Sequence, residues 1–401
     1  MPPRAVRFRP PPVTMSPAIL WMLRRAFGPP GAPAPTGVTL EEALALCRRF
    51  ELSGRVAARQ GRERLAAELG EGAAGFSRDQ AGAVGMGLRL TALATRLAAV
   101  AASLDLPVVF LKFAALELSG ALAPGSRSAG DVDLLVPSAG VAGAADLQRA
   151  LLSQGFSASD LPGLEHQLPA LAGPEGVVEL HRVLLGVRLA GRTSATAEEL
   201  AREGLLVPLP DLPGRAAVPA SAVAVAHTLV HGLGQHGWWP QSYPLFKMIG
   251  DLIDLGLGGP AGAALAERAG AWIAVDIPRI EVEATRRLAA ALVAGEDLAA
   301  WGESAAPEAL LLRHLLAGRL DPAYERSLRL GLFRPAPSDR PATARLVRIL
   351  WRTVFLTRRQ VDAVYGKPRG GALGYLGRQL WRPLDLAGRL ARYGASAFKA
   401  R

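Results

Sequence analysis

Two aspartates, Asp131 and Asp133, stand two residues apart at the start of a short apolar run that ends at Pro137. On a β-strand, side chains alternate between faces, so both carboxylates would project to the same side of a sheet. Two neighbouring carboxylates repel each other, and a bound divalent cation removes that repulsion. Because Mg²⁺ takes one or two carboxylates together with substrate phosphates, the pair predicts a Mg²⁺ (or Mn²⁺) site that acts on a phosphate compound. The alternative is that the two aspartates cap a turn or pair with Arg127.

A third carboxylate, Glu179, lies in the apolar stretch from Val177 to His181. A half-buried glutamate without a partner is costly, so a metal ion or a positive group is expected near it. An ion pair with an arginine is the alternative. If the three acids converge, they suit two-metal phosphoryl chemistry. Asp131 and Asp133 would then bridge both ions, while Glu179 would help hold the second ion and accept a proton from the attacking hydroxyl.

Basic and hydroxyl side chains lie close to the acids in the sequence. Lys112 closes an apolar strand and begins the turn into a helix, where a positive side chain would add to the attraction of a helix N-terminus for phosphate. A solvated lysine is the alternative. Ser126 and Arg127 lie in a loop of small residues just before Asp131. For Arg127, both a phosphate contact and a salt bridge to the carboxylates fit this position.

Histidine and cysteine offer little support for a zinc site. His227 and His231 share one face of a predicted helix and His236 follows, but no further ligand has convincing spacing. Cys47 is the one cysteine, which excludes an internal disulfide and a cysteine-rich zinc site. Its helical, apolar neighbourhood predicts a buried core residue. Single-cysteine usage is typical of a protein from the reducing cytoplasm.

The elements that must position the acids are short strands and helices between residues 106 and 220. The pattern predicts strands at 108–112 and 131–136, helices at 114–122 and 139–154, and a hairpin from 166–172 and 177–185. This order predicts an α+β fold, a small mixed sheet with helices on one face. Helical patterns flank it, with a lead-in at 37–105 that a capping box of Thr39 and Glu42 begins, and a helical domain at 221–333.

This central part resembles the polymerase-β-like nucleotidyltransferase superfamily, and within it a bacterial family described as uncharacterised nucleotidyltransferases. The resemblance covers roughly residues 95 to 260 and rests on three motifs. These are Phe110-Leu-Lys112, Arg127-Ser-Ala-Gly-Asp131-Val-Asp133-Leu-Leu-Val136, and Val177-Val-Glu179-Leu-His181. A histidine-containing helix followed by Lys247-Met-Ile-Gly-Asp251-Leu-Ile-Asp254 extends it loosely.

The resemblance implies a transferase that moves a nucleoside monophosphate from a nucleoside triphosphate to an acceptor, with Mg²⁺ or Mn²⁺ as cofactor. It assigns Asp131, Asp133 and Glu179 as catalytic residues and metal ligands. The residues implied in nucleotide binding are Lys112, Ser126, Arg127 and Asp251. The acceptor, whether a small molecule, a protein side chain or an RNA end, is left open.

One departure from the family pattern concerns Phe113, which stands where the family has glycine after Leu-Lys. A glycine there would let the backbone approach phosphate. Phe113 therefore favours an alternative function. The chain would then be a weak or inactive scaffold with the nucleotidyltransferase fold, which binds a partner, a nucleotide or an anionic membrane surface. The three retained acids argue for the enzyme.

The charge of the chain is concentrated in its last part. Residues 334–401 hold 15 lysines and arginines and 3 aspartates, a net charge of +12, whereas the other 333 residues hold 31 basic and 32 acidic side chains. Arginines recur there at helical spacing beside Trp351 and Trp381. Basic amphipathic helices suit an anionic membrane surface or RNA. The alternative is the solvated face of a helix packed on the body.

Residues 1–36 are rich in proline and arginine and are predicted to be disordered apart from a turn or two near Trp21. No segment reaches the roughly 18 uncharged apolar residues of a membrane-spanning helix, and no secretory signal is evident. We therefore expect a cytoplasmic protein, with a peripheral location at the inner face of the membrane as the option that the basic tail opens. The abundance of Ala, Gly, Pro and Arg is typical of a bacterial source.

Overall fold

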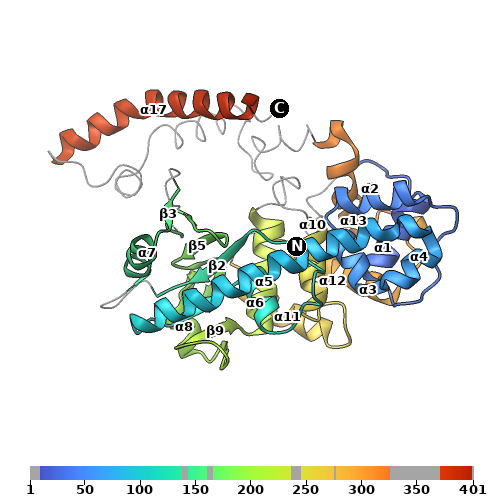
Figure 1. Ribbon diagram of the computed structural model, residues 1–401, viewed down its shortest axis with the longest axis horizontal. Helices are drawn as coiled ribbons and strands as arrows, with labels where there is room; N and C mark the ends of the chain where they lie inside the picture. The colour runs from blue at the N-terminus through green and yellow to red at the C-terminus, as the bar shows by residue number, and fades with distance from the viewer. Residues whose placement is uncertain are drawn as a thin grey trace, which may run out of the picture.

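The computed structural model describes residues 10–137, 143–159, 166–235, 245–274, 277–325 and 371–399 of the 401-residue chain. Figure 1 shows how these parts are arranged. Most of the predicted tail, residues 334–370, lies outside the described residues, as does His236.

A seven-stranded sheet forms the centre, in the order β3-β4-β5-β2-β1-β9-β8. β2 runs antiparallel to β1 and parallel to β5, and β1 runs parallel to β9, so the sheet is mixed. This confirms the predicted α+β fold. Its strands are β1 (Val108–Phe110), β2 (Asp131–Leu135), β3 (Ser157–Ala158), β4 (Leu171–Ala172), β5 (Val177–His181), β8 (Leu206–Pro208) and β9 (Ala216–Pro219).

The predicted hairpin is present. β4 and β5 pair antiparallel, with Leu171 opposite Val178, and the Gly173 N–H donates to the Gly176 carbonyl across the turn. The hairpin strand ends at His181, and the chain then forms a separate two-stranded sheet from β6 (Leu184–Leu189) and β7 (Arg192–Ala195).

Alternation of side chains gives the central sheet two buried faces. On one face, Phe110, Val132 and Leu134 pack with α5 (Ala74–Ser103), α6 (Lys112–Leu118) and α7 (Ala144–Ser153). On the other, Val109, Leu111 and Leu135 pack with the β6–β7 hairpin, α8 (Ala197–Arg202) and α9 (Ser221–Leu229). The prediction of helices on one face only is therefore wrong, because apolar residues after β5 cover the second face as well.

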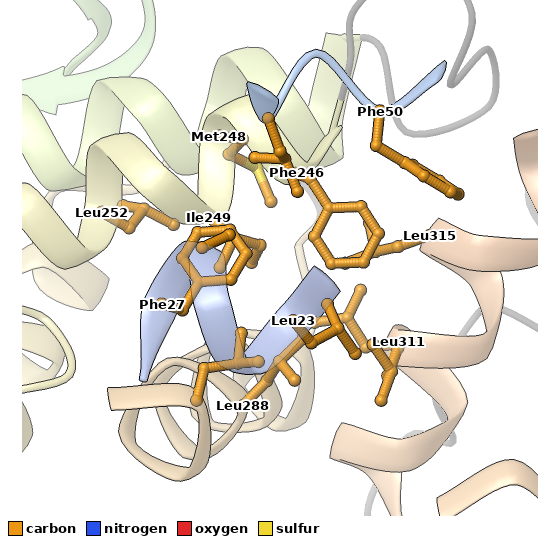
Figure 2. Close-up of a cluster of buried hydrophobic side chains, with 14 of the residues drawn as sticks. Leu23, Phe27, Phe50, Phe246, Met248, Ile249, Leu252, Leu288, Leu311 and Leu315 are labelled. Atoms are coloured by element: carbon orange, nitrogen blue, oxygen red, sulfur yellow. The ribbon is translucent and has the colours of Figure 1, made fainter. Parts of the chain in front are cut away.

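The remaining helices form a helical body with its own core. The early ones are α1 (Pro17–Phe27), α2 (Leu40–Arg49), α3 (Ser53–Gln60) and α4 (Arg62–Leu69); the late ones are α10 (Leu245–Asp254), α11 (Gly262–Trp272), α12 (Arg279–Ala294) and α13 (Pro307–Leu320). Figure 2 shows side chains from both groups in one cluster. The Phe246 ring lies 5.2 Å from the ring of Phe50 and 6.2 Å from that of Phe27. Segments at opposite ends of the sequence thus complete a single core.

Helix α1 contradicts the prediction that residues 1–36 are disordered. Ser16 caps it, with its hydroxyl accepting from the Ile19 N–H, and Pro17 occupies the first helical position. Trp21 and Phe27 are buried. The prediction of disorder failed because the apolar face of α1 is covered by α2 and α3 and, from more than 200 residues later in the sequence, by α12, which local composition does not reveal.

Helix α5 joins the helical body to the sheet. Its first half packs against α3, and its second half buries Leu90, Leu93 and Leu97 against the sheet. It is also the one described helix that is long and apolar enough to cross a membrane. Of its most apolar window, 39% is buried inside the protein. The predicted capping box at the start of α2 is confirmed, with Thr39 and Glu42 exchanging hydrogen bonds.

Candidate active site

Strand pairing places the three predicted acids together. β2 and β5 are parallel neighbours, and Asp133 stands directly opposite Glu179. Because residues two apart share a face, Asp131 and Asp133 project to the same side as Glu179. His181, two residues after Glu179, joins them. The structure therefore brings together Asp133 and Glu179, which are 46 residues apart in the sequence.

Asp133 is the centre of this group and is almost fully buried, with 2% of its surface exposed. One carboxylate oxygen, Oδ1, lies 2.8 Å from Lys112 Nζ and 2.9 Å from His181 Nε2. Burial alone would raise the pKa of Asp133. The positive charge of Lys112 and the hydrogen bond from His181 outweigh burial and hold the pKa well below its usual range. Asp133 is therefore an anion with both of its cationic partners in place.

Asp131 lies in a different environment although it is only two residues away. Burial and the charge of Asp133 raise the pKa of Asp131, and the more distant Lys112 offsets only part of this. Asp131 makes no hydrogen bond or ion pair with any residue that the structure describes. It is thus a partly buried carboxylate that only the more distant charges of Lys112 and Arg127 oppose, and a bound cation would relieve its repulsion from Asp133.

Lys112 reaches Asp133 through an unusual backbone turn. β1 still pairs with β2 at the Leu111 N–H, which donates to the Asp133 carbonyl at 3.0 Å. The next residue, Lys112, has φ of +49°, in the left-handed region. For a residue with a side chain this costs about 1–3 kcal/mol and is typical of functional sites. Although burial opposes it, the surrounding acids raise the pKa of Lys112, which stays charged.

His181 is a site residue whose importance sequence analysis missed. Its Nε2 lies 3.6 Å from Glu179 Oε2 as well as 2.9 Å from Asp133. Burial favours the neutral ring, but hydrogen bonds to these two acids outweigh it and raise the pKa of His181. Ligand atoms of Asp133, Glu179 and His181 all lie within 4.8 Å of one another. The available signal was spacing, because residue 181 shares a strand face with residue 179.

Two of the predicted nucleotide-binding residues form a buried ion pair with each other. Arg127 Nε donates to Asp251 Oδ1 at 2.7 Å, and both side chains are buried. Burial raises the pKa of Asp251 despite the opposing charge of Arg127. This pair fastens the loop before β2 to helix α10 of the helical body. Direct nucleotide contact by Arg127 and Asp251 stays a prediction.

Ser126 precedes this pair and has an unsatisfied hydroxyl. Its Oγ is buried and has no hydrogen-bond partner among the described residues. Buried hydroxyls normally have partners, so the orphan oxygen marks a place for a polar ligand atom next to the loop. This fits the predicted nucleotide contact of Ser126.

Phe113 does not occupy the acid cluster. Its ring is buried in the core of the sheet beside Gly87 of α5, and the Arg127 guanidinium lies 5.3 Å from the ring centroid. The left-handed conformation belongs to Lys112, whereas Phe113 has an ordinary negative φ. The backbone at 113 therefore does not require the conformational freedom of glycine, and the sequence argument for an inactive protein loses its physical basis.

His227 lies behind Lys112, on α9. Burial and the nearby charge of Lys112 lower the pKa of His227 to about 3, so its ring is neutral. His227 and His231 are not part of the metal-compatible group found among the described residues. A cavity of about 240 Å³ separates α6 from α9, with polar lining groups from Lys112, Ser119, Ser221, His227, Thr228 and Asp254.

A divalent cation fits the chemistry of this cluster. The group whose ligand atoms converge consists of the carboxylates of Asp133 and Glu179 and the imidazole of His181. The predicted ligand Asp131 is not in this group, but it lies beside it on the same strand face without a hydrogen bond or ion pair to any described residue. Hard cations such as Mg²⁺ prefer carboxylate oxygens, whereas an imidazole nitrogen widens the choice of metal. The ammonium group of Lys112 supplies positive charge at Asp133 in the same place.

Comparison with known proteins gives one match. The sequence model of a family described as uncharacterised nucleotidyltransferase matches residues 36–247, more than half of the chain. The matched region runs from just before α2 into α10 and includes Lys112, Ser126, the three acids and His181. No curated protein and no solved structure matches the sequence.

Proposed function

The chain belongs to the uncharacterised nucleotidyltransferase family, and on this premise we propose that it is a metal-dependent enzyme that transfers a nucleoside monophosphate from a nucleoside triphosphate to an acceptor. The observation that carries the proposal is the charge imbalance on one sheet face. Asp131, Asp133 and Glu179 share that face, and Asp131 lacks a partner among the described residues. A structural ion-pair network would balance its charges, whereas a phosphoryl-transfer site must leave room for a cation.

Asp131, Asp133 and Glu179 would hold the metal, Mg²⁺ or Mn²⁺, which when bound supplies positive charge to the reacting phosphate and lowers the pKa of the attacking hydroxyl. His181 would orient Asp133 and Glu179 through its two contacts. Imidazoles and carboxylates that fix each other's orientation in this way are usual around metal sites.

The transfer itself would be an in-line displacement. The acceptor oxygen forms a bond to the α-phosphorus, the bond from that phosphorus to the bridging oxygen of the β-phosphate breaks, and pyrophosphate leaves with the bonding electrons. Glu179, which has 26% of its side chain accessible, would accept the proton of the acceptor hydroxyl.

Cationic and hydroxyl groups would bind the triphosphate. The ammonium group of Lys112 would bind a phosphate oxygen, and the Ser126 hydroxyl would donate to the same phosphate group. The Arg127–Asp251 pair would act as a positioning element that keeps Ser126 next to β2. The cavity beside Lys112 offers space for part of the nucleotide or the acceptor.

The alternative function, a scaffold with the nucleotidyltransferase fold, rests on one observation. Lys112 and His181 already satisfy Asp133 without any metal, and such a closed contact is compatible with a site that no longer turns over. The two functions differ in whether metal and nucleotide bind productively at Asp131.

The deciding experiment measures pyrophosphate release from each of the four nucleoside triphosphates with Mg²⁺ or Mn²⁺, together with calorimetric metal titration. We expect wild-type protein to bind metal and to release pyrophosphate, and Asp131→Asn to lose both by at least about a hundredfold, since loss of groups that merely support a metal ligand already costs 10–100-fold. Asp211→Asn, at an exposed loop position, is the matched control. Equal metal binding by wild type and Asp131→Asn would refute the proposed site.

A further inference from the structure

The C-terminal helix α17 (Gly371–Lys399) exposes its apolar side. Leu373, Leu376, Leu380 and Leu384 recur every three or four residues and therefore share one face of the helix. Their exposed fractions are 79%, 55%, 67% and 63%, and Trp381 beside them is 54% exposed. Figure 1 shows α17 along the upper edge of the view, apart from the sheet. Such a contiguous stripe marks an interaction surface rather than ordinary surface composition.

The polar side of the same helix is the more covered one. Tyr375, Gln379, Arg382 and Asp385 are half-buried, and Arg382 pairs with Asp385 at 3.5 Å. A helix that packs on its own protein normally buries its apolar face and exposes its polar one. The reversed arrangement of α17 means that its apolar face is directed to something outside the chain.

The charge of α17 selects the kind of partner. In sequence it carries Arg378, Arg382, Arg389, Arg392 and Lys399 against the single acid Asp385, within a tail of net charge +12. Basic residues beside an apolar stripe that includes tryptophan are the composition of helices that lie in the headgroup region of an anionic bilayer. Helix α17 is too highly charged to cross the bilayer. Among the described helices, only α5 is long and apolar enough to do so.

Other partners fit α17 less well. RNA would engage the arginines but would leave four exposed leucines without a role. A coiled coil with a second copy would require a regular apolar seam on a straight helix. Instead α17 contains Pro383, and its sequence has glycine at 374, 377, 388 and 394. Glycine and proline weaken an isolated helix, which suits a segment whose helical form is stabilised by the lipid surface.

We propose that α17 is a membrane-surface helix that binds the anionic face of a phospholipid bilayer through Leu373, Leu376, Leu380, Trp381 and Leu384. Its arginines contact the lipid phosphates at the rim of the buried stripe. The helix lies in the plane of the interface, and the rest of the protein stays on its polar side. This attachment is independent of the proposed transferase chemistry.

The test is co-sedimentation of the full chain with vesicles of phosphatidylglycerol and phosphatidylcholine, compared with vesicles of phosphatidylcholine alone. We expect binding to the anionic vesicles that is at least tenfold stronger than to neutral ones and that decreases as salt is raised. The triple variant Leu376→Gln/Leu380→Gln/Leu384→Gln should lose at least tenfold in partitioning to the anionic vesicles. Circular dichroism confirms that it is folded.

A matched control comes from the body. Leu88 on α5 is 67% exposed, the same as Leu380, and Leu88→Gln should bind vesicles like wild type. Four outcomes would overturn the proposal. The first is equal binding by the triple variant and wild type, and the second is wild-type binding that does not distinguish anionic from neutral vesicles. The third is a stable dimer without vesicle binding that the triple variant converts to monomer in light scattering. The fourth is that wild type binds RNA tightly and does not bind vesicles, while the triple variant keeps the RNA binding; the helix would then be assigned to RNA.

Discussion

The helical body and the sheet face both bury charged side chains, but they balance them differently. In the body, Arg25 pairs with Glu68 at 2.6 Å and Arg55 pairs with Asp254, so each of these two buried cations has its own anion. On the sheet face, three carboxylates share one lysine and one histidine, and Asp131 is left without a partner among the described residues. Balanced pairs hold the fold together, whereas the unbalanced group is where an external cation adds most.

The largest effect is expected from Phe113, which links the two regions through Arg127. Phe113→Gly should lower the free energy of unfolding by about 4–6 kcal/mol, because removal of a buried phenyl ring costs about 3–5 kcal/mol and glycine within a helix adds about 1 kcal/mol. Urea denaturation measures this. We expect no tighter binding of a fluorescent ATP analogue, because the ring is in the core. Improved nucleotide affinity at unchanged stability would show instead that Phe113 blocks the phosphate site.

Breaking a balanced pair in the body should have the next largest effect. Arg55→Met leaves the carboxylate of Asp254, 14% exposed, without its cation, and should destabilise the protein by about 3–5 kcal/mol. The double variant Arg55→Met/Asp254→Leu should recover most of that loss, since an apolar pair can replace a buried ion pair at little cost. If the double variant were no more stable than the single one, the pair would be more than a structural contact.

Substitution of Asp131, in contrast to substitution of Arg55, should increase the stability of the protein. Without metal at neutral pH, Asp131→Asn should stabilise the protein by about 0.5–1 kcal/mol, the size of repulsion between neighbouring like charges on a sheet. Folding raises the pKa of Asp131, so its charge destabilises the fold above that pKa, and the gain should shrink as the pH falls through it.

Added Mg²⁺ or Mn²⁺ should make the wild-type protein more stable than Asp131→Asn, because ligand binding stabilises only the protein that binds it. Thermal melts of both proteins with and without metal measure the reversal. A variant that is less stable than wild type without metal would mean that Asp131 has a partner after all.

The smallest effect concerns Cys47, whose reaction with a thiol reagent measures opening of the helical body without any substitution. Burial, helped by Asp79, raises the pKa of its thiol, and the side chain is fully buried. A thiol reagent should therefore modify the folded protein at least about a hundred times more slowly than the unfolded chain, through opening of the body alone. Mass spectrometry over time measures the rate. Fast modification under native conditions would mean that the helical body opens easily.

Sequence reasoning reached the parts of the site that depend on local periodicity. Alternation along a strand was enough to predict that Asp131 and Asp133 lie on one side of the sheet. The same rule applied from Glu179 predicts that His181 shares its face, but this inference was not drawn from the sequence. The fold class followed from the order of strands and helices, and the family resemblance is confirmed by the match over residues 36–247.

What sequence reasoning missed depends on contacts between distant segments or on backbone conformation. Arg127 and Asp251 are 124 residues apart, and nothing in either neighbourhood indicates the partner of the other. The left-handed conformation of Lys112 was likewise not predicted from the sequence, which drew attention to position 113 instead. Helix α1 packs on its sequence neighbours α2 and α3 and also on α12, in a core that it shares with the other late helices of the body.

The shared core of the helical body has a consequence for how the protein is made. Chains leave the ribosome from the amino end, and domains generally fold as soon as their residues have emerged. The apolar face of α1 finds its full set of neighbours only when residues up to Leu316 of α13 have been synthesised. The fully buried residues of the sheet's two cores end at Val218 on one face and at Val223 on the other, so the sheet can be completed first. Although α2 and α3 cover part of α1 early, its remaining apolar surface waits for the late helices of the body, and in that interval it is a natural target for chaperones that hold nascent chains.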